Sequence, residues 1–200
     1  MHSSATPVLT YRKSGDGVDE VAAHISKAQN VPDSTYPTMR NHAKQIPGKY
    51  LGGEGALHRI PYYGTEWRAN RAEKDRACER RGRYRLTGLP DPAGGWQGKE
   101  CDEYPFASTL EGANSAKCDF SVEAVTATQN SRAGAMLMNF YDQSGQRCHF
   151  VQHLGRFGGK SHRRVEGVGA VYQFVDSRDC DGPLGGQHAD PLELNELQFP

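Results

Sequence analysis

Residues 100–112 read Glu-Cys-Asp-Glu-Tyr-Pro-Phe-Ala-Ser-Thr-Leu-Glu-Gly, which places carboxylates around a short apolar run in the middle of the chain. Pro105 cannot continue a helix and biases Tyr104 toward extended geometry, so we expect a strand end or a rigid loop. Neighbours on a strand point to opposite faces, so one of Asp102 and Glu103 can face a cleft while the other braces the loop. Such a place suits a positioned acid or base, and a solvated acidic turn is the alternative.

The segments after this stretch predict a strand followed by a helix. Residues 120–127 alternate apolar and polar side chains, which is typical of a half-buried strand. Asn130 or Ser131 can cap the following helix, whose apolar residues recur at helical spacing up to Tyr141. The predicted fold class is therefore α+β, with a small antiparallel sheet and packed helices.

Other elements are predicted in the same way from periodicity and from breaking residues. We expect helices over residues 18–29, 38–46 and 65–81 and strands over residues 84–89, 148–154 and 168–175. A flexible arm over residues 1–17, a single domain over residues 18–180 and an extended tail over residues 181–200 complete the expected organisation.

The composition describes a polar chain with many loops, because 36% of the 200 residues are hydrophobic and 23 are glycine. The 24 basic and 24 acidic residues cancel, so any affinity for a polyanion must come from local patches. No apolar run reaches the ~18 residues of a membrane span, and we expect no membrane partner. The N-terminal residues lack the apolar segment of an export signal.

The five cysteines are Cys78, Cys101, Cys118, Cys148 and Cys180. None of them forms a Cys-x-x-Cys pair, which argues against a zinc site and favours disulfides with one cysteine left over. Disulfides imply an oxidising destination, so we expect a secreted, extracellular protein or a domain that is delivered to other cells.

A family resemblance adds to these patterns. The run from Cys101 to Thr109, followed by Glu111-Gly112, Ser121-Val122 and residues 129–134 (Gln-Asn-Ser-Arg-Ala-Gly), resembles the NucA/NucB-type deoxyribonucleases in their secreted, actinomycete-like form. The lead-in segments of that family are similar to the following residues: Tyr36-Pro37, Met39, His42-Ala43, Leu57-His58-Arg59, Asn70-Arg71 and Ala77-Cys78. The resemblance extends from Tyr36 to Tyr141.

The resemblance implies a ββα-metal nuclease core, in which a two-stranded ribbon carries the general base and the next helix carries a metal ligand. No histidine stands in the acidic motif, so Asp102 or Glu103 would act as the base. The residues expected to provide oxygen ligands for Mg²⁺ or Mn²⁺, with Ca²⁺ as a further option, are Glu111, Asn130 and Asn139. Arg132 would contact the phosphate, and a disulfide between Cys78 and Cys101 would fasten a basic helix beside the carboxylates.

Two basic segments are candidates for binding the DNA backbone. The predicted helix over residues 65–81 carries Arg68, Arg71, Lys74 and Arg76, but its C-terminal end has fewer acids. We therefore select Arg80, Arg81 and Arg83 from that end, and Lys160, Arg163 and Arg164 from a glycine-rich loop. Solvated surfaces are the alternative in both places.

The predicted function is a metal-dependent endonuclease that hydrolyses DNA with little sequence preference, because no motif for reading bases is present. It would act outside the cell or as an antibacterial toxin domain with a cognate immunity or inhibitor protein. The alternatives are a secreted non-catalytic binding module and a carbohydrate hydrolase that uses a carboxylate pair.

Overall fold

The computed structural model describes residues 7–49, 55–116 and 119–144 and the backbone of residues 169–175. Its helices are α1 (Asp19–Asn30), α2 (Thr65–Cys78) and α3 (Ala127–Gln143), with short 3₁₀ turns at Pro32–Ser34 and Gly82–Tyr84. Its strands are β1 (Val8–Arg12), β2 (Leu57–His58), β3 (Lys99–Tyr104), β4 (Ser121–Thr126) and β5 (Gly169–Val175). This arrangement confirms the α+β class.

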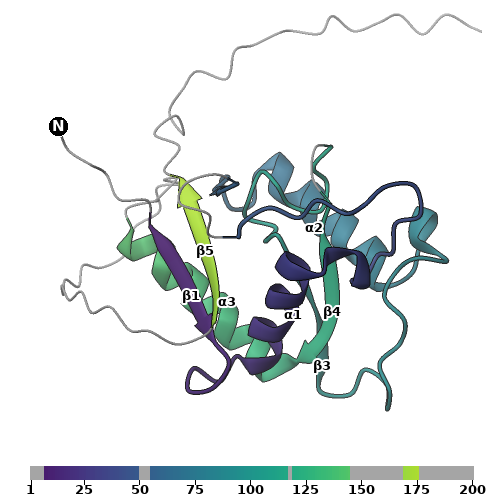
Figure 1. Cartoon of the computed structure of the whole chain (residues 1–200), viewed down its shortest axis with the longest axis horizontal. Coiled ribbons are helices and arrows are strands. Elements are labelled where there is room, and N and C mark those ends of the chain that lie inside the picture. Colours follow the sequence, from purple (N-terminus) through teal and green to yellow (C-terminus); the bar gives the residue numbers. More distant parts are fainter. Residues whose placement is uncertain (1–6, 50–54, 117–118, 145–168, 176–200) are drawn as a thin grey trace, which may run out of the picture.

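An antiparallel ribbon of β3 and β4, followed at once by α3, forms the ββα unit at the centre of the molecule (Figure 1). The register pairs Asp102 with Glu123 and Tyr104 with Ser121. Tyr104 and Val125 are almost fully buried, as the alternation along these strands predicts. The acidic motif therefore lies on a strand, and the predicted strand–helix order after it is confirmed.

Helix α1 packs between the ribbon and a second sheet, in which β5 lies between β1 and β2 (Figure 1). β1 pairs antiparallel with β5, and β2 pairs parallel with it. The apolar side chains of α1 that enter the core follow one helical stripe, which is what holds the helix there: Val21, Ala22, Ile25 and Ala28.

Glu20 of α1 fixes the start of α3. Its carboxylate accepts hydrogen bonds from the Thr126 backbone N–H at 2.5 Å and from the Thr126 hydroxyl at 2.9 Å, while Gln129 accepts one from the Glu20 N–H at 2.8 Å. A carboxylate at this end satisfies a free N–H group and complements the helix dipole. Burial acts to raise the pKa of Glu20, but the two Thr126 hydrogen bonds and Lys99 together lower it.

Helix α2 is joined to the ribbon by a disulfide between Cys78 and Cys101, as expected. Beneath this bridge, Tyr84, Phe120 and Val122 form a second apolar cluster with the end of α2. The covalent link and this cluster hold the basic helix beside the acidic strand.

Four expectations about local structure are wrong. Residues 8–12, placed in a flexible arm, form β1, because Leu9 and Tyr11 are buried by distant parts of the chain. Residues 38–46 are not helical, and residues 84–89 form turns instead of a strand. α3 begins at Ala127, ahead of the predicted caps, because Glu20 supplies the cap from another helix.

Several expectations concern parts of the chain that lie outside the described residues. These parts are the predicted strand at residues 148–154, the glycine-rich loop with Lys160, Arg163 and Arg164, the tail from residue 176, and Cys118, Cys148 and Cys180. Within the part that the structure describes, no helix has the length and apolar character needed to cross a membrane.

Candidate active site

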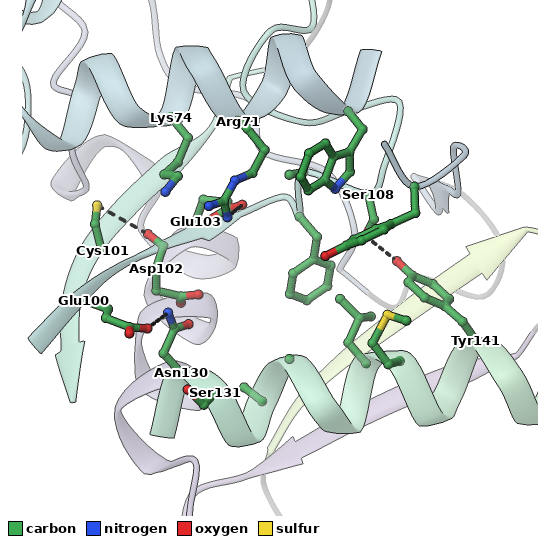
Figure 2. A pocket seen from close by; sticks show the side chains of 18 of the residues that line it. Arg71, Lys74, Glu100, Cys101, Asp102, Glu103, Ser108, Asn130, Ser131 and Tyr141 are labelled. Atoms are coloured by element: carbon green, nitrogen blue, oxygen red, sulfur yellow. Dashed lines mark hydrogen bonds and ion pairs between the residues drawn. The ribbon is translucent and has the colours of Figure 1, made fainter. Parts of the chain in front are cut away.

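A pocket of about 550 Å³ lies where α2, β3 and the first turns of α3 meet. Figure 2 shows Arg71 and Lys74 of α2 on one side of the acidic strand and Asn130 and Ser131 of α3 on the other. All four residues from Glu100 to Glu103 line the pocket, so the acidic motif borders a real cavity and is not a solvated turn.

Glu103 faces α2. Its side chain is only 14% exposed, and its Oε1 lies 3.8 Å from the guanidinium of Arg71. Burial raises the pKa of Glu103; Asp102 acts in the same direction, while Lys74 and Arg71 oppose it without cancelling it. A carboxyl group with a raised pKa is a better proton acceptor once ionised than an ordinary exposed glutamate.

Asp102 projects from the other face of β3 and is held by His24 of α1. The imidazole Nδ1 lies 2.7 Å from Asp102 Oδ2, and its Nε2 lies 2.8 Å from the hydroxyl of Ser121. His24 and Ser121 are fully buried. This chain of hydrogen bonds uses one carboxylate oxygen of Asp102 and fixes the direction of the other.

Asn130 lies in the second turn of α3 and donates a 2.8 Å hydrogen bond from Nδ2 to Glu100 Oε2. Glu100 and Asp102 are two residues apart on β3 and therefore share a face. Figure 2 shows the side chains of Asp102 and Asn130 pointing toward each other across the pocket. Carboxylate and amide oxygens are thus collected on the side of the strand that faces α3.

Three of the selected residues lie elsewhere. Glu111 binds His58, accepting from its backbone N–H at 2.9 Å and pairing with its Nδ1 at 2.6 Å, so it anchors β2. Asn139 is nine residues after Asn130, which on a helix means the opposite face and about 14 Å along the axis. Arg132 is exposed and lies against Gly17. The structure does not bring these three residues to Asp102.

The positive groups of the pocket come from the middle of α2. Of the basic residues selected at its C-terminal end, Arg81 pairs with Glu79 and Arg83 with Glu73, while Arg80 lines a separate hollow beside the disulfide. Arg71 and Lys74 line the pocket instead.

Two sequence signals point to further residues of the site, one for Arg71 and Lys74, which line the pocket, and one for His24, which bonds Asp102 without lining the pocket itself. Arg71 and Lys74 share a helix face with Cys78 at spacings of three and four, and the disulfide to Cys101 requires that face to meet β3. His24 was not selected at all, although it falls three residues after Val21 and four before Ala28 on the apolar stripe of α1. A histidine at such a position needs a buried polar partner, and only the fold shows that this partner is Asp102.

The donor set fits a hard divalent ion. Among residues 7–49, 55–116 and 119–144, no three His, Cys, Asp or Glu side chains gather closely enough to hold an ion alone. The α3-facing side nevertheless offers oxygens from Glu100, Asp102 and Asn130. Magnesium is usually bound by one or two carboxylates together with water and substrate phosphate, so the chemistry of these side chains matches that of its usual ligands.

A comparison with known protein families identifies the family to which the pocket-bearing part of the chain is similar. The family model for Deoxyribonuclease NucA/NucB matches residues 53–150. This part of the chain belongs to the NucA/NucB deoxyribonuclease family. No curated protein and no solved structure matches the chain.

The deoxyribonuclease match covers α2, the ββα unit and every pocket-lining residue except Tyr11. The family resemblance expected from the sequence is confirmed from residue 53 to Tyr141, while its upstream segments, from Tyr36 to Ala43, lie outside the matched residues. The family match supports a deoxyribonuclease over the two alternatives, a carbohydrate hydrolase and a non-catalytic binding module. His24 lies outside the matched residues, on a helix that completes the site from the N-terminal side.

Proposed function

We propose that this deoxyribonuclease is a metal-dependent endonuclease that cuts DNA with little sequence preference at the pocket between α2, β3 and α3. One observation carries the proposal: β3 separates the pocket into two sides with different chemistry. Oxygen donors lie on the side of α3, and a buried carboxyl group lies beside cations on the side of α2.

Asp102 and Asn130, with Glu100 beside them, are the residues that would hold the divalent ion. When bound, such an ion supplies positive charge for the phosphoryl oxygens and the leaving group of a phosphodiester. His24 keeps Asp102 in place for this role, because its hydrogen bond fixes the orientation of the carboxylate.

Glu103 is the residue that we propose as the general base, which takes a proton from the attacking water. Its raised pKa supports this role, and so does its position beside Arg71, where a phosphate would sit. Asp102 is the alternative base, and its engagement with His24 makes it better suited to hold the ion.

Arg71 is placed to bind the scissile phosphate, and Lys74 adds positive charge to the same side of the pocket. The side chain of Arg71 is 46% exposed and can reach substrate. The Lys74 side chain is only 8% exposed and pairs with Asp75 at 2.7 Å, so it contributes charge and no direct contact with the phosphate. Contacts of this kind recognise the backbone and carry no sequence information, which supports cleavage without base preference.

Action outside the cell is part of the proposal, supported by the disulfide, since such bridges persist in oxidising surroundings. A role as a delivered toxin domain with an immunity partner is the more specific form of the same proposal.

Cleavage of supercoiled plasmid tests the function. Purified protein with Mg²⁺ or Mn²⁺ should give nicked and linear products, and a chelator should stop the reaction. Intact plasmid with every divalent ion across a range of pH would refute the proposal, and cleavage that survives the chelator would refute its metal dependence.

A further inference from the structure

Three aromatic side chains form a cluster at the edge of the pocket, which we call the aromatic platform: Tyr62, Tyr63 and Trp67. The Tyr62 ring centroid lies 4.3 Å from that of Tyr63 and 4.8 Å from that of Trp67. The rings of Tyr63 and Trp67 are 5.0 Å apart. The three rings therefore pack on one another at the start of α2.

The platform leaves much of its surface in solvent. Tyr62 is 43% exposed and Tyr63 is 62% exposed. These rings therefore forgo much of the stabilisation that large aromatic side chains give when they are buried in a core. Tyr63 also has a backbone φ of 62°, a left-handed conformation that is unfavourable for a non-glycine residue. Backbone strain of this kind clusters at ligand-binding sites, and here it holds a ring in solvent.

The platform is continuous with the phosphate-binding side of the proposed active site. Tyr62 and Trp67 line the same pocket as Glu103. The Arg71 guanidinium lies 5.7 Å from the Trp67 ring centroid and 3.8 Å from the Glu103 carboxylate. A cation that would contact a phosphate is therefore in direct reach of both the platform and the proposed base.

We propose that the aromatic platform stacks an unpaired nucleobase next to the phosphate bound at Arg71, and that single-stranded or locally melted DNA is the preferred substrate. The inference rests on the proposed function. Bases in a duplex already stack on both faces, so a ring can take a base only from a strand that is open at that point. Stacking accepts every base, which agrees with cleavage without sequence preference.

The experiment compares Tyr62→Ala/Tyr63→Ala with Tyr62→Phe/Tyr63→Phe, which keeps both rings. Each variant and the wild type are given three substrates of one length: an oligothymidylate, a strand of abasic residues with the same number of phosphates, and a duplex. The wild type and the Phe variant should cleave the oligothymidylate about 5- to 100-fold more efficiently, by kcat/KM, than the abasic strand. The Ala variant should lose most of this preference because its kcat/KM falls on the oligothymidylate, while its kcat/KM on the abasic strand should stay the same.

A binding measurement provides a readout that does not depend on cleavage. In a Trp96→Phe background Trp67 is the sole tryptophan, since the chain has two. Oligothymidylate added in chelator should quench its fluorescence, and the abasic strand should not. Three outcomes would each overturn the inference. The Ala variant could lose cleavage rate equally on the oligothymidylate and the abasic strand, the wild type could prefer the duplex, or the fluorescence of Trp67 could stay unchanged.

These outcomes separate the two proposals. A wild type that cleaves no DNA but shows base-dependent quenching of Trp67 refutes the catalytic proposal and supports the platform. A wild type that cuts oligothymidylate, abasic strand and duplex alike supports the nuclease and overturns the platform. Melting temperatures of all variants identify any loss of folding, and the Phe variant then decides between ring and hydroxyl.

Discussion

His24 Nδ1 lies 2.7 Å from Asp102 Oδ2 inside the core, although the two residues are 78 positions apart in the chain. The same imidazole bonds Ser121 at 2.8 Å, so α1, β3 and β4 are joined at one side chain. The exposed surface holds a second His–Asp pair, His42 with Asp119 at 3.0 Å, which offers a natural comparison.

Replacing His24 should damage both stability and cleavage. His24→Ala leaves the buried side chain of Asp102 without its hydrogen-bond partner, which costs about 1–3 kcal/mol of unfolding free energy or more. The matched control is His42→Ala, whose pair has a 53% exposed imidazole and should contribute less than about 1 kcal/mol. Chemical denaturation and plasmid cleavage of both variants check this, and equal effects would contradict the positioning role of His24.

Glu103→Gln should abolish cleavage and raise stability at neutral pH. Loss of a general base reduces the rate by roughly 10²- to 10⁴-fold. The raised pKa of Glu103 means that the folded state disfavours its ionised form. As pH rises from the unfolded-state pKa to the folded-state pKa, the unfolded chain therefore ionises first and the folded protein loses stability. The neutral amide of the variant cannot ionise and avoids this loss.

The two effects have separate measurements. The melting temperature of Glu103→Gln should exceed that of the wild type at pH 7, and the difference should shrink as pH falls below the ordinary glutamate pKa. In the wild type, kcat/KM should fall as pH falls through the raised pKa of Glu103. A variant that is less stable than the wild type at pH 7 and still cleaves would show that Glu103 is structural.

Asn130→Ala should weaken the metal dependence and leave the base intact. Loss of one oxygen ligand lowers affinity for the ion before it removes the chemistry, so the metal concentration for half-maximal cleavage should rise and excess metal should restore part of the rate. Asn139→Ala, on the opposite face of α3, is the control and should resemble the wild type. A metal dependence that moves equally in both variants would remove Asn130 from the proposed ligands.

Removing the Cys78–Cys101 bridge should lower the free energy of unfolding by about 3 kcal/mol, because the unfolded chain gains conformational entropy when a loop of this size is no longer closed. The loop spans 23 residues between the end of α2 and β3. Cleavage by Cys78→Ser/Cys101→Ser should fall further than its unfolded fraction explains, because Arg71 and Lys74 lose their fixed distance from Glu103. Peptide mapping under non-reducing conditions should find the two cysteines joined, and free thiols at both would contradict the bridge.

Much of the ββα unit could be predicted from the sequence. The local patterns are alternation over residues 120–127, helical spacing after it and Pro105 at the end of the acidic strand. Each is set by a residue and its near neighbours in the chain. The acidic motif can likewise be selected from the sequence as a candidate site, because carboxylates beside an apolar run and the family resemblance both point to it.

Spacing along a helix does not show which of its faces meets the sheet, so several of the partners expected for the acidic motif lie elsewhere in the structure. Asn139 was selected as a ligand, but two and a half turns place it on the opposite face of α3 from Asn130. Arg80, Arg81 and Arg83 were selected for their surplus of charge, yet Arg81 and Arg83 are engaged by nearby glutamates. Arg71 and Lys74 reach the pocket because the disulfide turns their face toward β3.

The ββα order, the acidic motif and the family can be recognised from the sequence, because these depend on local periodicity and on residues that are contiguous in the chain. The pairing of β1 with β5, with Leu9 opposite Tyr172, and the contact of His24 with Asp102 become visible only in the folded chain. Such contacts form only after several elements have packed, since burial removes water from both partners at once and makes their pairing necessary. No pattern within a short window records which distant residue will meet that need.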